Sequence, residues 1–66
     1  MEYVVVECNA SRQVLVDGSA CGNTNETLQI DKGTRTFRVP GCLPESTTVE
    51  VAGTSPATPL TLTFTC

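Results

Sequence analysis

The stretch from Leu60 to Cys66 reads Leu-Thr-Leu-Thr-Phe-Thr-Cys and alternates strictly between apolar side chains and threonine. Successive side chains of a β-strand point to opposite faces, so this alternation predicts a strand with one buried face and one face in water. No segment shows a sustained apolar pattern of helical spacing. The stretch therefore indicates an all-β protein without helices.

Similar short runs precede this strand. Eleven threonines, eight valines and one isoleucine are β-branched, and β-branched side chains suit the pleated surface of a sheet. Six such runs, separated by turn residues, predict a small antiparallel β-sandwich that forms a single domain over residues 1–66. The expected strands are Tyr3–Cys8, Arg12–Asp17, Thr27–Ile30, Thr34–Val39, Thr47–Ala52 and Leu60–Cys66.

Turn residues connect these runs. The Asp17-Gly18 pair is a turn signal, because glycine adopts a positive φ at little cost. A tight turn ending at Gly33 predicts a hairpin between the third and fourth strands, and the segment 40–44 ends the sheet because proline cannot donate to a central ladder. Ser19–Asn25 and Gly53–Pro59 are expected loops. The residues assigned an architectural role are Asp17, Gly18, Gly33, Gly41 and Pro44.

The run Tyr3-Val4-Val5-Val6 is apolar on both faces of its strand. Two interpretations remain open for it. It is either buried between the layers of the sandwich, which we favour, or it forms an exposed edge that recruits a partner strand or a second copy of the chain.

The charge balance argues against nucleic acid as a partner. Four Lys and Arg residues face seven Asp and Glu residues, for a formal net charge of −3, whereas nucleic-acid binding usually shows a basic patch. The one local basic cluster, Lys32, Arg35 and Arg38, is interpreted as solvated charge around a turn. No segment approaches the ~20 apolar residues of a membrane span.

The order of turn residues and apolar pairs resembles the PEGA domain. The matching motifs span about residues 11–66, although Asn25 stands where the family commonly has proline and Cys42 where it commonly has an aromatic residue. The motifs are Val16-Asp17-Gly18, Gly22-Asn23-Thr24, Leu28-x-Ile30, Gly33, Phe37-x-Val39, Gly41-Cys42-Leu43-Pro44, Val49-x-Val51 and Pro59-Leu60-x-Leu62-x-Phe64.

This resemblance implies a small all-β accessory module of bacterial and archaeal proteins, often at the cell surface and without known catalytic machinery. It supplies no binding residues that could be assigned to this chain. The cysteine in place of the aromatic residue at position 42 would be compensated by pairing with another cysteine.

Four cysteines and no histidine limit the available chemistry. A domain of about 60 residues buries only about 60% of its unfolded surface, and small scaffolds often add disulfides. Four cysteines allow three connectivities. Cys8 and Cys66 share the inward phase of terminal strands, and Cys21 and Cys42 both lie in loops, so the expected pairs are Cys8–Cys66 and Cys21–Cys42.

Other thiol chemistries remain as alternatives. The cysteines could be free, buried thiols, or they could converge on one zinc ion, which the absence of any Cys-x-x-Cys motif disfavours. We expect no cofactor. Without histidine, a Ser-His-Asp or Cys-His catalytic arrangement is excluded. Asn9-Ala10-Ser11 and Asn25-Glu26-Thr27 match the glycosylation sequon.

The sequence therefore predicts a non-enzymatic structural or protein-interaction module. Its expected partner is a protein or a component of the cell envelope, with self-association through a strand edge as a further expectation. Two alternatives are a small secreted effector or inhibitor held by disulfides and a thiol-based metal or redox protein. Disulfides would favour a location outside the cytoplasm, whereas free thiols and the missing basic leader would favour the cytoplasm.

Overall fold

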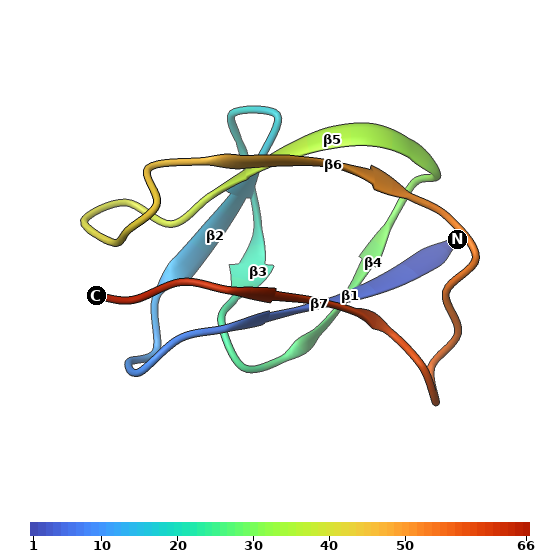
Figure 1. Ribbon diagram of the computed structural model, residues 1–66, viewed down its shortest axis with the longest axis horizontal. Helices are drawn as coiled ribbons and strands as arrows, with labels where there is room; N and C mark the ends of the chain where they lie inside the picture. The colour runs from blue at the N-terminus through green and yellow to red at the C-terminus, as the bar shows by residue number, and fades with distance from the viewer.

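Seven strands and no helix make up the computed structural model, which describes residues 1–66. The predicted all-β sandwich is confirmed, with seven strands where six were expected. The strands form a three-stranded and a four-stranded sheet, and Figure 1 shows β5 and β6 above β1 and β7. In chain order they are β1 (Glu2–Glu7), β2 (Gln13–Val16), β3 (Ser19–Asn23), β4 (Thr27–Ile30), β5 (Gly33–Arg38), β6 (Thr47–Val51) and β7 (Leu60–Thr63).

β1 is the central strand of the three-stranded sheet, whose order is β4-β1-β7. It pairs antiparallel with β4 and parallel with β7, where Val4 lies opposite Leu60 and Glu7 lies opposite Thr63. The expectation of a purely antiparallel sandwich is therefore wrong for this pair. The first and last strands of the chain run side by side in the same direction, and both point toward the end of the molecule that carries the C-terminus (Figure 1).

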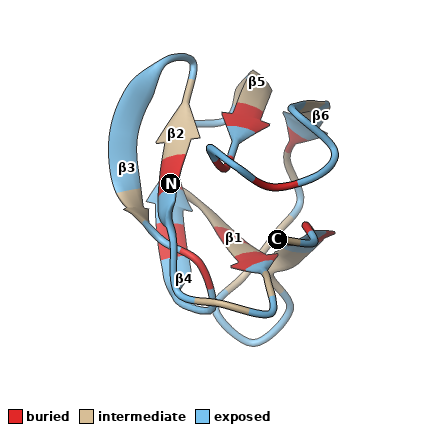
Figure 2. Cartoon of the chain, turned by 90° about the vertical axis from the view of Figure 1, so that its left-hand side faces the viewer, coloured by how far each residue is buried: buried red, intermediate tan, exposed pale blue.

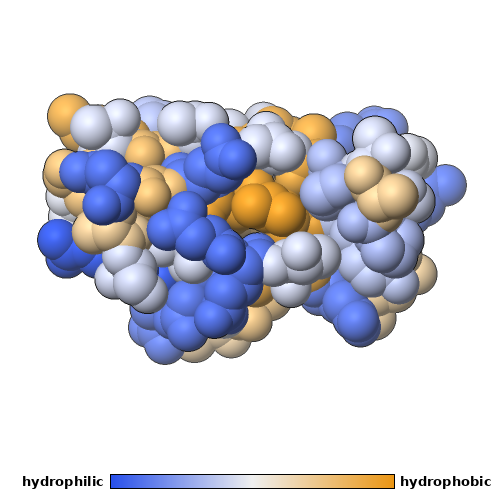
Figure 3. Space-filling view, turned by 90° about the horizontal axis from the view of Figure 1, so that it is seen from below, coloured by the Kyte–Doolittle hydropathy of each residue, from blue (hydrophilic) through white to orange (hydrophobic).

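The central position of β1 explains why its sequence is apolar on both faces. Val4 and Val6 are fully buried in the core, whereas Tyr3 and Val5 are half-buried on the other face. The run is therefore not an edge strand, and the favoured interpretation of burial holds for its inner face. Figure 3 shows the molecule from below, where a hydrophobic patch is visible near the centre of this face between more hydrophilic residues.

The four-stranded sheet has the order β3-β2-β5-β6 and is antiparallel throughout. Its edge strand β3 occupies a segment that was expected to be a loop, and that expectation is wrong. The reason is the preceding turn: Asp17 and Gly18 have φ values of 51° and 85°. Positive φ at both positions is the geometry of a two-residue hairpin turn. The turn folds Ser19–Asn23 back onto β2, although the segment contains no β-branched residue.

The hairpin expected between β4 and β5 is absent. The two strands belong to different sheets, because β4 pairs with β1 while β5 pairs with β2 and β6. A short connection between two strands fits either a hairpin or a crossing from one layer of a sandwich to the other. Here the chain crosses at Asp31 and Lys32, and Gly33 begins β5 with a φ of 133°.

The core lies between the sheets and uses the side chains that the alternation predicted to face inward. Phe37 from one sheet and Phe64, which follows β7, are its largest members. Figure 2 shows buried residues on strands of both sheets. The buried apolar residues are Val4, Val6, Val14, Leu28, Ile30, Phe37, Val39, Cys42, Val51, Leu62 and Phe64.

Thr24 is the one buried polar residue, with 2% of its surface exposed. Its hydroxyl donates to the carbonyl of Ala10 at 2.8 Å and accepts from the N–H of Arg12 at 2.9 Å. Its own N–H donates to the carbonyl of Arg12 at 2.8 Å. These bonds attach the turn after β3 to the connection between β1 and β2, so the hydroxyl has a structural role.

Replacing Thr24 by valine keeps the shape of the side chain and removes the hydroxyl. Two backbone groups then lose their partner in a buried place, so we expect the free energy of unfolding to fall by about 1–3 kcal/mol. Urea denaturation of the folded variant measures this change. The matched control is Thr27→Val at an exposed position, for which we expect a change within about 0.5 kcal/mol. Equal effects of the two substitutions would contradict the structural role of the hydroxyl.

Candidate functional site

The parallel pairing of β1 and β7 brings two cysteines to the same end of the sandwich. The pairing continues past the end of β7, where the N–H of Phe64 donates to the carbonyl of Glu7 at 2.8 Å. Cys8 follows β1 directly and Cys66 lies just beyond Phe64. Because parallel strands end at the same edge of a sheet, the two side chains meet there.

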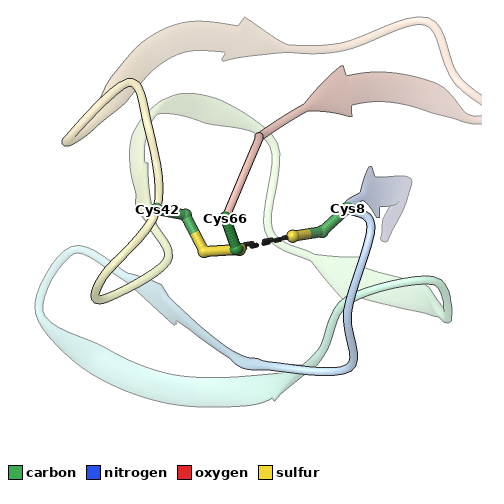
Figure 4. A group of neighbouring side chains, drawn as sticks. All are labelled: Cys8, Cys42 and Cys66. Carbon is green, nitrogen blue, oxygen red and sulfur yellow. Dashed lines mark hydrogen bonds between the residues drawn. A yellow bond between two sulfur atoms is a disulfide. The ribbon is translucent and has the colours of Figure 1, made fainter.

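A third cysteine comes from the corner of residues 40–44. Leu43 and Thr65 form an isolated antiparallel bridge in which each N–H donates to the other's carbonyl at 2.7 Å. This bridge holds Cys42, whose side chain is buried, beside Cys66. The two are joined in a disulfide with a Cα–Cα separation of 4.1 Å, and Figure 4 shows Cys8 reaching toward them from the opposite side.

The three sulfur atoms form one cluster. The Sγ atom of Cys8 lies 2.6 Å from that of Cys66 and 3.9 Å from that of Cys42. Cys66 is therefore the middle member, bonded to one neighbour and in close contact with the other. Cys8 and Cys66 are half-buried, so the cluster lies at the edge of the core.

Two asparagine side chains hold the backbone of this cluster. Asn9 accepts from the N–H of Cys66 at 2.8 Å and donates to its carbonyl at 3.0 Å. Asn25 does the same for Cys8, with both bonds at 3.1 Å, and it has a φ of 62°. Each side-chain amide therefore binds both the N–H and the C=O of one cysteine, as a residue of a neighbouring strand would. Sequence analysis identified both residues as sequon matches and Asn25 also as a departure from the PEGA pattern, and no spacing signal indicated these roles.

The expected disulfide pairing is wrong in the structure. The predicted proximity of Cys8 and Cys66 is present, but the bond joins Cys66 to Cys42, and Cys8 and Cys21 remain thiols. The pair Cys21–Cys42 fails because Cys21 lies on β3 and not in a loop near the corner. Partial burial of the Cys21 thiol raises its pKa above the ordinary value. The four cysteines therefore do not form one four-thiolate site.

Four of the predicted turn residues, Asp17, Gly18, Gly41 and Pro44, lie at turns or bends, whereas Gly33 is the first residue of β5. Asp17 also makes a tertiary contact. Its carboxylate accepts from the N–H of Thr36 at 3.0 Å and from Arg35 at 3.2 Å. The backbone bond and then the Arg35 bond lower the pKa of Asp17. Gly41 has a φ of 82°, and Pro44 follows a cis peptide bond. Arg35, from the basic cluster, is thus engaged within the fold.

Glu2 connects β1 to the loop after β6 at the other end of the molecule. Its carboxylate accepts from the N–H of Thr54 at 2.9 Å and from its hydroxyl at 2.7 Å. The hydroxyl oxygen of Thr54 also accepts from the N–H of Tyr3 at 2.7 Å. The backbone hydrogen bond from Thr54, followed by its side-chain bond, lowers the pKa of Glu2. The loop after β6 is thereby attached to β1.

A groove of about 420 Å³ lies beside β3 and the end of β4, which are edge strands of the two different sheets. Its walls come from β3 and from the end of β4. The apolar part is formed by Met1, Val16, Ala20 and Ile30, and the polar part includes Asp17, Asp31 and Arg35. Cys21 also lines this groove, away from the other three cysteines.

Comparison with known proteins adds no relative. No family model matches the chain, and neither the curated proteins nor the solved structures contain a match. The structure contains no helix that could span a membrane.

We predict that Asn9→Ala weakens the attachment of the cluster. The substitution removes two hydrogen bonds to Cys66, so the free energy of unfolding of the oxidised protein should fall by about 1–2 kcal/mol. Urea denaturation measures the effect. Asn23→Ala is the matched control, because Asn23 is an exposed asparagine on β3 without such bonds, and should change stability by less than about 0.5 kcal/mol.

The contact between Glu2 and Thr54 predicts a pH dependence. A carboxyl group whose pKa is lowered in the folded state stabilises the fold above its unfolded pKa. This stabilisation is lost as the pH falls from the ordinary value near 4.5 through the lowered folded value. We therefore expect Glu2→Gln to lose less stability over this range than the wild type.

The measurement is the urea midpoint as a function of pH. Glu26→Gln serves as the control, because it changes the same chemical group at an exposed site without a side-chain hydrogen bond. The urea midpoint of this variant should fall with decreasing pH as steeply as that of the wild type. Parallel curves for the wild type and Glu2→Gln would contradict the assigned role of the Glu2 carboxylate.

Proposed function

We propose that the chain is a non-enzymatic structural module that binds a partner protein along the edge of β3. The observation that carries this proposal is the groove beside that edge. A strand at the edge of a sheet has backbone N–H and C=O groups free to pair with an added strand. The neighbouring groove offers Ala20 and Ile30 as an apolar floor for alternate side chains of such a strand.

The use of the polar side chains supports a structural role. The carboxylates of Glu2 and Asp17 and the amides of Asn9 and Asn25 bind backbone groups of neighbouring segments. The buried hydroxyl of Thr24 does the same. These groups connect elements of the fold, so their chemistry serves the rigidity of the module.

The resemblance to the PEGA domain supports an accessory role. The motif order includes the Asp17-Gly18 turn and the Gly41–Pro44 corner, and both are bends of the chain in this structure. For such a module the expected partner is a protein or a component of the cell envelope. We propose an extended segment of a protein, because the β3 edge offers backbone hydrogen bonds to it.

A second candidate function is a secreted effector or inhibitor that displays a loop. The Cys42–Cys66 disulfide favours it, because the covalent ring that this bond closes contains the partly exposed loop between β6 and β7. Within the loop, Ser55 and Thr58 exchange backbone hydrogen bonds at 3.1 and 3.2 Å. Inhibition of a protease by the oxidised chain alone would favour this candidate.

Photo-crosslinking in cells that make the protein tests the β3 edge. A photoreactive residue in place of Ala20 should give a discrete adduct with another protein. The control is the same residue in place of Thr61, which is exposed on β7 in the other sheet, and it should give no such adduct. No adduct at Ala20, or equal adducts at both positions, would contradict the proposed binding edge.

A further inference from the structure

The cysteine cluster offers a chemistry that the proposed module does not use. Its three sulfur atoms come from three separate segments: the end of β1, the corner before β6 and the residues after β7. In the oxidised chain two of them are joined in the Cys42–Cys66 disulfide. The three sulfur atoms lie within 4.8 Å of one another in this oxidised chain, so reduction of the bond would leave three thiols close together.

We propose that the reduced cluster binds a single Cu(I) ion through the sulfur atoms of Cys8, Cys42 and Cys66. A dithiol reductant supplies two electrons and two protons, which convert the disulfide into two thiols, and the reductant becomes a cyclic disulfide. Binding of the ion then releases the protons of the three thiols to solvent, because the thiolate is the metal ligand.

The spacing of the sulfur atoms fits a three-coordinate ion. With metal–sulfur bonds of about 2.3 Å, three sulfur atoms around one ion in a plane lie about 4.0 Å apart. The Sγ atoms of Cys8 and Cys42 are already 3.9 Å apart. Cys66 must move away from both, and breaking its covalent bond to Cys42 permits this movement.

The number of ligands favours Cu(I) over zinc. Structural zinc sites take four protein ligands, usually cysteine and histidine. The chain has no histidine, and Cys21 lies in the groove beside β3, outside the cluster. Soft thiolate ligands suit Cu(I), zinc and iron–sulfur clusters, so ligand type alone does not separate these metals and the number of ligands decides. Three thiolates without a fourth such ligand therefore match a soft, three-coordinate ion.

Hydrogen bonds, in addition to the disulfide, position the backbone of the cluster. Leu43 and Thr65 exchange two hydrogen bonds, and the amides of Asn9 and Asn25 hold Cys66 and Cys8. These contacts remain available after reduction, so the ligands are held near one another before an ion binds. In the reduced chain the ion would link all three segments, whereas in the oxidised chain the disulfide links only those that carry Cys42 and Cys66.

Two arginines lie near the cluster. The guanidinium of Arg12 approaches Gly41, the neighbour of Cys42. Arg38 lines a small hollow together with Cys42, and Glu45 also lines it. Three thiolates and one Cu(I) ion carry a net negative charge, and nearby positive charges stabilise such a site.

Anaerobic titration of the reduced chain with Cu(I) tests the proposal. Competition with a coloured Cu(I) chelator measures the affinity, native mass spectrometry gives the stoichiometry, and X-ray absorption gives the ligands. We expect one ion per chain with three sulfur ligands, for the wild type and for the control Cys21→Ser. Cys8→Ser should bind at least about 100-fold more weakly, since even outer-shell partners change metal affinity by 10–100-fold.

Several results would overturn the proposal. These are equal binding by Cys8→Ser, loss of binding by Cys21→Ser, or tighter binding of zinc than of Cu(I) by the reduced chain. The fold of Cys8→Ser is checked in its oxidised form, which retains the Cys42–Cys66 bond. If the reduced wild type is unfolded without metal, one equivalent of Cu(I) must restore the amide spectrum of the oxidised protein. A copper-bound chain that stays unfolded overturns the proposal as well.

Discussion

The pairing of β1 with both of its neighbours is the interaction on which the rest of the structure depends. Neither β4 nor β7 pairs with the other, so the three-stranded sheet exists only through β1. The inner face of β1 also brings Val4 and Val6 into the core, where both are fully buried. In a chain of this size few side chains are available for a core. The same strand therefore supplies both the backbone pairing of this sheet and two side chains of the core.

The parallel direction of β7 and β1 determines where the cysteine cluster lies. Because this pair is parallel, Cys8 and Cys66 leave the sheet at the same end. The bridge between Leu43 and Thr65 then adds Cys42. Backbone hydrogen bonds therefore bring the three cysteines together, and the disulfide links two of them. The groove beside β3 is lined by none of these three cysteines.

Much of the fold could be predicted from the sequence, because alternation reports burial directly. Leu62 and Phe64 lie on the apolar face of the alternating stretch Leu60–Cys66 and are buried, as expected. Pairing could not be predicted in the same way, since alternation does not tell a hairpin from a crossing between layers. Both β4 and β5 were predicted as strands, but the hairpin expected between them was wrong for this reason.

The residues of the candidate site were harder to predict from the sequence. β3 was missed because Ser19–Asn23 has no strand-forming composition and is held by the turn before it. The proximity of Cys8 and Cys66 followed from their shared phase. The place of Cys42 depends on a bridge from an irregular corner, which leaves no pattern in the sequence.

A disulfide map of the native protein tests the account of the cluster most directly. The protein is isolated without reductant, alkylated at low pH to prevent exchange, and cleaved after Arg, Lys and Glu. Cuts after Arg12, Lys32 and Glu45 separate the four cysteines. The account predicts a link between the peptides of Cys42 and Cys66, with alkyl groups on Cys8 and Cys21. A link that includes Cys21, or an alkylated Cys66, would contradict it.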